Sequence, residues 1–504
     1  MTYDYCTILD DAARRTPEKI GLISQDTTFT YAEIAAAVDR LTAALAGQGI
    51  RQGDRVVLCL GNEPEWVFSF FALARLRATL VLVSTAWQQQ EFENAFALTQ
   101  PVGVIAAAGK ADLVDQLGRP RFAAVHGESA REGWLDLAEL VATPFEGGGL
   151  RPEPADPAEL ELAFPFSSGT TGVPKAVRHT HRSLYTATKQ WNETLGLGED
   201  DRLQALTPLA HILGIVNIGA TFMSSATITL FQKFSPTIMM DSLEQDRITI
   251  GMTVAPIAAA IATMPGLEER DLSALRYLNW SATPVNPAIA ADVTARTGIP
   301  WLPAYGTTEV PVVAVSPVSS LPHGRLDSVG LPPDGVDVEA IDVETLAFLP
   351  RGETGEIVVR SPAAMNGYLP EGGSSPFLDG GWYRTGDIGI VEPEGWVHVN
   401  DRKKDLIRVS GNQASPVEIE NVLMRSPFVK DCAVFGVSDE RRGEIPCAAV
   451  IPEPGWEPDE QTLIEWLAPQ LAAYKRLRSV YFVDEIPRTP SGKVQRRKLV
   501  PLAG

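Results

Sequence analysis

Basic residues are scarce in this chain. Its 504 residues include 43 lysines and arginines against 63 aspartates and glutamates, which gives a formal net charge of -20. A protein that binds nucleic-acid backbones needs a basic surface, so this composition argues against a general nucleic-acid binder. The acidic excess favours solubility, and any anionic substrate has to be held by local positive groups. At this length we expect several domains or subdomains.

Cysteine is scarce as well. The four cysteines are Cys6, Cys59, Cys432 and Cys447, and no two of them form a CxxC pair. This spacing indicates neither a zinc ribbon nor a disulfide framework, and it fits a reducing compartment. The opening residues, "MTYDYCTILDDAARR", lack the basic and apolar regions of a signal peptide. We therefore expect a cytoplasmic protein.

Long uncharged apolar runs are also missing. The most apolar stretch, "VFSFFALARLRATLVLVSTAW", contains Arg75 and Arg77. A membrane-spanning helix would carry few or no charges, so this stretch predicts a buried helix followed by a strand, and no membrane span. The sequence has no internal repeat and no low-complexity tract, and it does not indicate an oligomeric state.

What the chain does contain is a regular alternation of strand-like and helix-like segments. "DRVVLCL" and "VGVIAAA" are typical of short buried strands, and "EPEWVFSFFALARL" predicts a helix between them. Thr30 and Glu33 form a capping-box pattern in "TYAE", which marks the start of another helix. The alternation predicts an α/β fold with a parallel sheet.

The pattern changes from about Val329 onward. "VDVEAID", "GEIVVRS" and "GIVEPEGWVHVN" predict short strands in a small antiparallel, barrel-like part. Beyond Asp401, further strands and a helix predict a compact α+β unit, whose length of roughly 100 residues is enough to fold alone. We therefore predict a large N-terminal domain over residues 1–400 and a small C-terminal domain over residues 401–504.

The stretch "SSGTTGVPK", Ser167 to Lys175, has the composition of a phosphate-binding loop. It lies between the apolar "LELAFPF" and the helix-like "RSLYTATKQWNETL", so we expect a strand–loop–helix in which backbone N–H groups surround an anion. A Walker loop needs lysine directly after glycine, whereas Val173 and Pro174 separate Gly172 from Lys175, which argues against a Walker NTPase. Taken alone, the stretch also fits a flexible surface turn.

Three further segments carry residues suited to nucleotide chemistry. In "AYGTTEVP", Tyr305 offers an aromatic face for a base and Glu309 a carboxylate for a phosphate-bound Mg²⁺. Asp387 in "WYRTGDIG" has two oxygens to accept the hydroxyls of a ribose, and Lys493 lies in the basic loop "PRTPSGKVQRRKL". Singly, each also fits a plainer interpretation: a core tyrosine, a surface glutamate, an Asx-turn and a solvated tail.

Together these segments resemble the ANL superfamily of adenylate-forming enzymes, which includes acyl- and aryl-CoA synthetases, luciferases and peptide-synthetase adenylation domains. "FSSGTTGVPKAV", "YGTTEV", "YRTGDIG", "DRKKDLIRVSGNQASPVEIE" and "PRTPSGK" stand in the family's order and at compatible spacing over nearly the whole chain. Within the superfamily, the sequence pattern most resembles that of 4-coumarate–CoA ligase-like and fatty-acid CoA ligase-like enzymes. In that family the C-terminal domain is mobile.

The resemblance implies a two-step reaction. A carboxylate attacks the α-phosphorus of ATP to give acyl-AMP and pyrophosphate, and a thiol then displaces AMP to give a thioester. Since the first step brings an anion to a polyanion, neutralisation by Mg²⁺ and a mobile lysine fits its needs. Coenzyme A is the expected thiol, and a carrier-protein phosphopantetheine or another nucleophile is the alternative. A regulator that binds nucleotide without turnover is the alternative of a different class, and the intact Lys493, Glu309 and Asp387 argue against it.

The resemblance also implies a role for each motif residue. Lys493 is the mobile catalytic lysine, Tyr305 holds the adenine, and Asp387 with Arg402 holds the ribose. Glu309 binds the metal and takes part in catalysis. The other nucleotide-binding residues, among which Thr170 is also catalytic, are Ser167, Ser168, Gly169, Thr170, Thr171, Gly172, Lys175, Gly306, Thr307 and Thr308.

The resemblance places a hinge and a thiol side in the last hundred residues. Lys404 stands where the family has its hinge residue, about which the small domain rotates between an adenylating and a thioester-forming pose. In the second pose, Arg408, Ser410, Gly411 and Gln413 face the active site.

The acyl side is implied by two segments. His211 in "LTPLAHILGI" stands where the acyl and aryl branch has a catalytic pocket histidine, although a histidine in an apolar run is also often a packed residue. The segment has no carboxylate to pair with a buried ammonium, which disfavours α-amino acids. Where relatives read Ser-Gly-Ala-Ala-Pro, this chain reads "WSATP" with Trp280, Ser281 and Ala282, and Ala304 replaces a usual glycine. A bulkier pocket predicts a small, short- or medium-chain or aryl acid, and core packing of Trp280 is the alternative.

Overall fold

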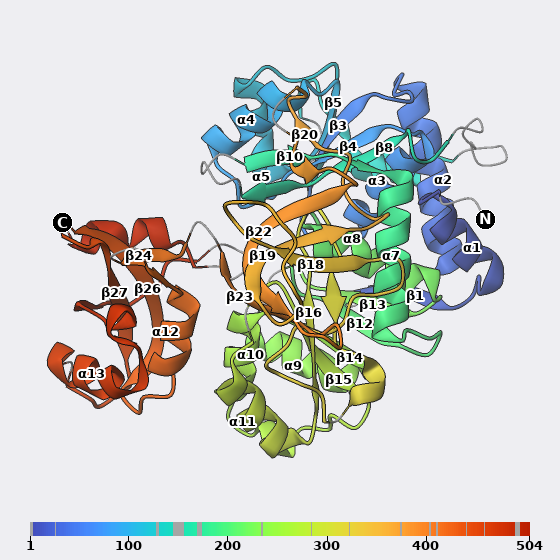
Figure 1. Cartoon of the computed structure of the whole chain (residues 1–504). Coiled ribbons are helices and arrows are strands. Elements are labelled where there is room, and N and C mark those ends of the chain that lie inside the picture. Colours follow the sequence, from blue (N-terminus) through green and yellow to red (C-terminus); the bar gives the residue numbers. More distant parts are fainter. Residues whose placement is uncertain are drawn as a thin grey trace.

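The computed structural model describes most of the chain and gives the mixed α/β fold that the alternation predicts (Figure 1). The described residues are 4–25, 27–127, 131–144, 156–168, 174–232, 235–283, 285–321, 323–372, 375–402, 405–409, 412–439, 441–457, 459–488 and 494–503.

The first large sheet has seven strands in the order β11-β8-β4-β3-β5-β6-β7. Neighbouring strands are parallel, except that β11 runs antiparallel to β8. The central strands are buried, as expected of a parallel sheet with helices on its faces. Its strands are β3 (Arg55–Cys59), β4 (Thr79–Leu82), β5 (Gly103–Ala107), β6 (Phe122–His126), β7 (Leu135–Asp136), β8 (Glu161–Phe164) and β11 (His179–Thr180). The helices of this part of the chain are α1 (Thr7–Arg15), α2 (Tyr31–Gly47), α3 (Pro64–Arg75), α4 (Gln89–Thr99), α5 (Ala108–Gln116) and α6 (Leu137–Ala142).

The second large sheet has eight strands in the order β17-β16-β15-β14-β12-β13-β1-β2. It is parallel from β16 to β1, and β2 and β17 close its two ends antiparallel to their neighbours. Its strands are β1 (Ile20–Ser24), β2 (Thr27–Thr30), β12 (Arg202–Ala205), β13 (Thr227–Leu230), β14 (Ile250–Thr253), β15 (Tyr277–Trp280), β16 (Trp301–Tyr305) and β17 (Ala314–Val315). The helices of this part of the chain are α7 (His181–Leu195), α8 (Ile212–Met223), α9 (Pro236–Gln245), α10 (Ala255–Ala262) and α11 (Pro287–Thr297).

Two local predictions are confirmed in these layers. Thr30 caps α2, and its side chain and that of Glu33 form the reciprocal capping box. The apolar stretch that contains Arg75 is the buried helix α3 followed by β4, and the guanidinium of Arg75 pairs with Asp10 and Asp39. This pairing meets the requirement that a buried charge have partners. Among the helices of the described residues, none has the length and apolar character needed to cross a membrane.

The antiparallel part follows as predicted. A five-stranded sheet runs β18-β19-β22-β21, with β23 also paired with β22, and a three-stranded sheet has the order β20-β10-β9. The predicted domain boundary, at residues 400 and 401, falls within β23, because β23 pairs with β22 as far as Arg402. The boundary itself stays a prediction. The strands are β9 (Phe166–Ser168), β10 (Pro174–Val177), β18 (Asp337–Ile341), β19 (Thr354–Arg360), β20 (Tyr368–Leu369), β21 (Phe377–Leu378), β22 (Trp382–Val391) and β23 (Val397–Arg402).

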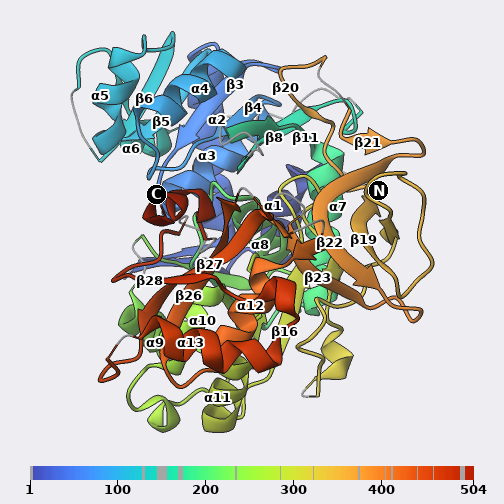
Figure 2. The same ribbon diagram turned by 60° about the vertical axis from the view of Figure 1, so that its left-hand side comes forward.

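The C-terminal elements gather on one side of the larger body, and Figure 2 brings them to the front. They form the α+β unit expected from the sequence, with the strand order β25-β24-β27-β26 and β28 parallel to β27. The unit has its own buried cluster, which includes Ile419, Val434 and Leu463. Its elements are β24 (Ile407–Val409), β25 (Asn412–Ala414), α12 (Pro416–Leu423), β26 (Val429–Asp439), β27 (Gly443–Pro452), α13 (Glu460–Leu467) and β28 (Ser479–Phe482).

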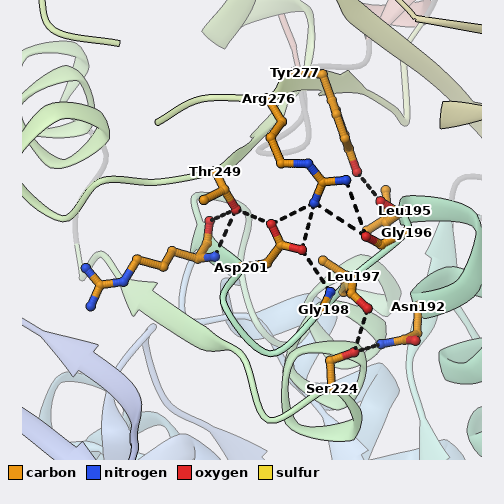
Figure 3. A network of polar contacts seen from close by, with 11 residues as sticks. Asn192, Leu195, Gly196, Leu197, Gly198, Asp201, Ser224, Thr249, Arg276 and Tyr277 are labelled. Carbon is orange, nitrogen blue, oxygen red and sulfur yellow. Dashed lines mark hydrogen bonds and ion pairs between the residues drawn. The ribbon is translucent and has the colours of Figure 1, made fainter. Parts of the chain in front are cut away.

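A polar network fixes the amino-terminal edge of the second large sheet (Figure 3). Asp201, Thr249 and Arg276 directly precede the neighbouring strands β12, β14 and β15. A guanidinium nitrogen of Arg276 lies 2.7 Å from each carboxylate oxygen of Asp201, and the Thr249 hydroxyl donates to the same carboxylate at 2.6 Å. The backbone N–H of Gly198, just beyond α7, donates to it at 2.8 Å. The network therefore connects the end of α7 to three strands.

Candidate active site

The two ends of the predicted phosphate loop face each other across an antiparallel pair. Ser168 is opposite Pro174 and Ser167 opposite Lys175 in the pairing of β9 with β10. The loop was expected to lead directly into a helix, and this is wrong: β10 and β11 follow it, and α7 begins only at His181. The strand that follows the loop, β10, is fixed on both edges, because it pairs with β9 and with β20. The side chain of Ser168 and the predicted loop residues Gly169, Thr170, Thr171 and Gly172 lie outside what the structure describes.

The residues predicted to hold adenine and ribose are in direct contact. Tyr305 ends β16 and its hydroxyl donates to the carboxylate of Asp387 on β22, which is 3% exposed. The backbone of Asp387 pairs with that of Arg402 on β23, so the third predicted residue is its strand neighbour. Gly386, just before Asp387, has φ +71°, a conformation that favours glycine. The side chain of Arg402 lies outside the described atoms.

Glu309 is a buried carboxylate without a basic partner in the described part of the chain. It is 7% exposed, and the hydroxyl of Tyr368 donates to its Oε1 at 2.9 Å. The ammonium of Lys175 lies 5.1 Å from the centre of the Tyr368 ring, which brings the phosphate-loop lysine close to this carboxylate. Burial and then the charge of Glu309 raise the pKa of Tyr368, so its hydroxyl stays protonated and can donate. A buried carboxylate of this kind suits a bound cation.

His179 holds the segment that carries Thr308 and Glu309, a role that the sequence analysis missed. Its Nε2 lies 2.8 Å from the carbonyl oxygen of Thr308, and its Nδ1 lies 3.0 Å from the hydroxyl of Ser183. Because a carbonyl only accepts, the proton is on Nε2. Burial lowers the pKa of His179 to about 4, which keeps the ring neutral near pH 7. The partner lies 129 residues away, so no local pattern could have indicated it.

The backbone of the same motif turns sharply after Tyr305. The hydroxyl of Thr307 accepts from the N–H of Val310 at 2.9 Å. A Cβ added at Gly306 would lie 2.0 Å from the carbonyl oxygen of Pro311, so only glycine fits there. Glu309, in this turn, contacts Tyr368 on β20, whereas Tyr305, just before the turn, contacts Asp387 on β22.

On the predicted acyl side, His211 caps α8. It is half-buried, and its Nδ1 accepts from the N–H of Leu213 at 3.3 Å. The loop that leads to it is held by Asn62, a second residue that the sequence analysis missed. The Asn62 amide donates to the carbonyl of Thr207 at 3.0 Å, and its oxygen accepts from the N–H of Leu209 at 2.9 Å.

Trp280 is fully buried among the α9–α11 helices and their strands. Its ring lies 5.1 Å from that of Trp301, and its indole N–H donates to the Thr283 hydroxyl at 3.2 Å. This is the core packing that the sequence left open as the alternative. Ser281 and Ala304 are also buried, and Ala282 has φ +61°. The role of these four residues in an acyl pocket stays a prediction.

The predicted thiol side is described only in part. Arg408 is exposed on β24, and its backbone N–H donates to Glu444 at 2.7 Å. The predicted hinge Lys404, the thiol-side Ser410 and Gly411, the side chain of Gln413 and the catalytic Lys493 lie outside the described residues.

The described residues thus bring together Tyr305, Asp387, Thr308, Glu309 and Lys175 from segments far apart in the sequence. Comparison with known proteins identifies the family of the chain. The family described as "AMP-binding enzyme" matches residues 9–369, and "AMP-binding enzyme C-terminal domain" matches residues 418–493.

Individual relatives match over most of the chain. The chain is 34% identical to 4-coumarate–CoA ligase 1 of Oryza sativa subsp. japonica, an alignment that covers 94% of this chain and 87% of that protein. Its fold matches the anthranilate CoA ligase AuaEII in complex with anthranoyl-AMP, with a TM-score of 0.89, 27% identity and coverage of 100% and 98% of the two chains. ATP-bound MatB from Rhodopseudomonas palustris matches with a TM-score of 0.91, 27% identity and coverage of 100% and 99%.

Proposed function

The chain belongs to the AMP-binding enzyme family, and on that premise we propose that it activates a carboxylic acid with ATP and transfers the acyl group to coenzyme A. The convergence of Tyr305, Asp387 and Glu309 carries the proposal. Tyr305 ends β16 and contacts Asp387 on β22, and Glu309 lies in the turn after β16 and contacts Tyr368. This grouping supports an ATP site of the kind that an adenylating enzyme needs. The names of the matched ligases support the same reaction.

In the first step a carboxylate oxygen of the acid attacks the α-phosphorus, and the bond to the β-phosphate oxygen breaks with release of pyrophosphate. Tyr305 provides an aromatic face for adenine, and Asp387, which accepts from the Tyr305 hydroxyl, also accepts from ribose hydroxyls. Lys175 and the phosphate loop bind the leaving phosphates, and Lys493 stabilises the charge between acid and α-phosphate. A cation and an anion about 4 Å apart attract by about 4 kcal/mol at an effective dielectric of 20.

Mg²⁺ fits beside Glu309, because this carboxylate is buried and has a hydroxyl as its described partner. When bound, the ion neutralises phosphate charge. His179 bonds to the carbonyl of Thr308, just before Glu309, and Tyr368 bonds to the Glu309 carboxylate. These two contacts keep the proposed metal ligand in position. In the second step the thiol sulfur attacks the acyl carbon, AMP leaves and the thiol gives up its proton.

The acid we propose is small and uncharged beyond its carboxylate, either aryl or of short to medium chain. The loop that leads to His211 offers no carboxylate for an α-ammonium. A carrier-protein phosphopantetheine is the alternative acceptor, and Lys404 remains the proposed hinge between the two steps.

Pyrophosphate release over a panel of aryl, short-chain and medium-chain acids tests the proposal, with α-amino acids as the comparison set. We expect release with at least one acid of the first three groups, and thioester formation when coenzyme A is added. Absence of release with every acid would favour a nucleotide-binding regulator. Transfer to a holo carrier protein but not to coenzyme A would reassign the acceptor. Lys493→Ala should stop acyl-AMP formation and leave the conversion of supplied acyl-AMP intact.

A further inference from the structure

Glu63, Glu65 and His126 form a cluster away from the nucleotide residues. Glu63 precedes α3 and Glu65 lies in its first turn, whereas His126 is the last residue of β6. One ligand atom from each residue lies within 4.8 Å of the other two. Nε2 of His126 is 3.4 Å from Oε2 of Glu63 and 3.9 Å from Oε2 of Glu65. Two carboxylates therefore converge on one imidazole nitrogen.

The charges of this cluster are not balanced within the described part of the chain. Glu63 is 8% exposed, and neither it nor Glu65 pairs there with a lysine or arginine. Asp136, at the end of β7, is a third acidic residue in this region, because it pairs with Val125, the neighbour of His126. Buried carboxylates are normally paired with basic side chains or coordinate metals. Three carboxylates and one imidazole carry a net negative charge, which a bound cation would neutralise.

The position of the cluster in the fold also favours a ligand. In the strand order β8-β4-β3-β5-β6, β4 follows β3 in the chain and lies on one side of it, whereas β5 lies on the other side. The topological switch point of the sheet is therefore between β3 and β5. Glu63 lies beyond the carboxyl end of β3, at this switch, and His126 is the last residue of β6, which is the second strand from β3 on the β5 side. Ligands of open α/β sheets bind in the crevice at such a point.

The loop that carries Glu63 is fixed before any ligand binds. Glu63 Oε1 accepts from the backbone N–H of Gly61 at 3.2 Å, which leaves Oε2 directed at His126. Asn62, which directly precedes Glu63, is buried and donates to the carbonyl of Thr207 while accepting from the N–H of Leu209. A preorganised donor set binds a metal at a lower conformational cost.

From this geometry we infer that Glu63, Glu65 and His126 bind a divalent transition-metal ion of the zinc class. An imidazole with two carboxylates suits Zn²⁺ and its neighbours, whereas Mg²⁺ and Ca²⁺ prefer sites made only of oxygen. Ligands about 2.1 Å from a tetrahedral zinc ion lie about 3.4 Å from one another, which the His126–Glu63 distance matches. Glu65 and His126 are each about one quarter exposed at the side chain, so solvent can complete the coordination shell.

Titration of the full chain, first treated with a chelator, with Zn²⁺ and separately with Co²⁺ tests the inference. We expect one tight equivalent by calorimetry and a d–d absorption band with Co²⁺, both insensitive to excess Mg²⁺. Removal of one ligand, in His126→Gln or in the isosteric Glu65→Gln, should weaken binding by at least about tenfold. Neither residue belongs to the proposed ATP site, so pyrophosphate release reports independently on the proposed function.

His398→Gln is the matched control, because His398 also pairs with a glutamate, Glu392, whose charge Arg325 compensates. This variant should bind the metal as the parent chain does. Zn²⁺ should raise the melting temperature of the parent and of His398→Gln by more than that of Glu65→Gln. Absence of binding by the parent, or binding that survives both ligand variants, would show that the cluster is only a His–Glu ion pair at a helix start.

Discussion

Buried carboxylates at the two edges of the eight-stranded sheet have different kinds of partner. At the amino edge, Asp201 is 6% exposed and has an arginine, a hydroxyl and a backbone N–H as partners. Beyond the carboxyl end of β16, Glu309 is 7% exposed, and its described partner is a tyrosine hydroxyl. Similar burial with different partners indicates that Asp201 stabilises the fold, and the difference supports the proposal that Glu309 binds a cation from outside the chain.

The largest effect we expect is on activity, from Glu309→Gln. The substitution keeps the shape and removes the charge, so a Mg²⁺ ligand is lost while the Tyr368 contact can persist. Metal assistance is worth several kcal/mol, and we expect pyrophosphate release to fall at least about 100-fold. The melting temperature should not decrease, because the substitution removes a buried charge that has no basic partner among the described residues. Near-normal release at saturating Mg²⁺ would exclude Glu309 as the metal ligand.

Asp201→Asn is the matched change at the opposite edge, and there we expect a loss of stability. Arg276 would lose its ion-pair partner, the Asp201 carboxylate. Because the Arg276 side chain is 38% exposed, the pair is half-buried, and the free energy of unfolding should fall by about 2 kcal/mol. Urea unfolding measures this cost, and pyrophosphate release per folded molecule should be close to that of the parent. A stable variant with reduced release would contradict the division between the two edges.

His179 offers an intermediate effect at the carboxyl edge. His179→Leu removes the donor to the Thr308 carbonyl, and we expect kcat for pyrophosphate release to fall about tenfold, the value of one hydrogen bond of about 1.4 kcal/mol. His179→Gln retains an N–H donor and should recover part of this loss. Equal losses in both variants would show that His179 contributes only packing.

The pH dependence of stability gives a second test of His179. Its pKa is about 4 in the folded chain and about 6.5 when exposed, so the unfolded state binds the proton first on acidification. The free energy of unfolding should therefore fall as the pH drops from about 6.5 toward 4. In His179→Gln the difference between urea midpoints at pH 7 and pH 5 should be smaller than in the parent.

Local patterns predicted the elements well but not the contacts across the chain. The capping box at Thr30 and the buried helix that contains Arg75 could be predicted from neighbouring residues. The strands β10 and β11 could not, because β10 forms only through pairing with β9 and β20. Asn62 and His179 were missed for the same reason: their partners lie more than one hundred residues away. Motif order identified Tyr305, Asp387 and Glu309, yet only the fold shows which hydroxyl holds each carboxylate.

The smallest expected effect, from Thr249→Val, sharpens the description of the amino edge. The substitution preserves shape but removes the hydroxyl that donates to Asp201 and accepts from the N–H of Arg202 at 3.0 Å. Because Arg276 still pairs with Asp201, the expected loss is about 1 kcal/mol in urea unfolding, without change in pyrophosphate release. Thr263→Val is the control, since that exposed hydroxyl bonds only within its own helical turn and its removal should change stability by less than about 0.5 kcal/mol. If Thr249→Val instead slowed release at unchanged stability, the amino edge would be coupled to the active site and would not serve only as scaffold.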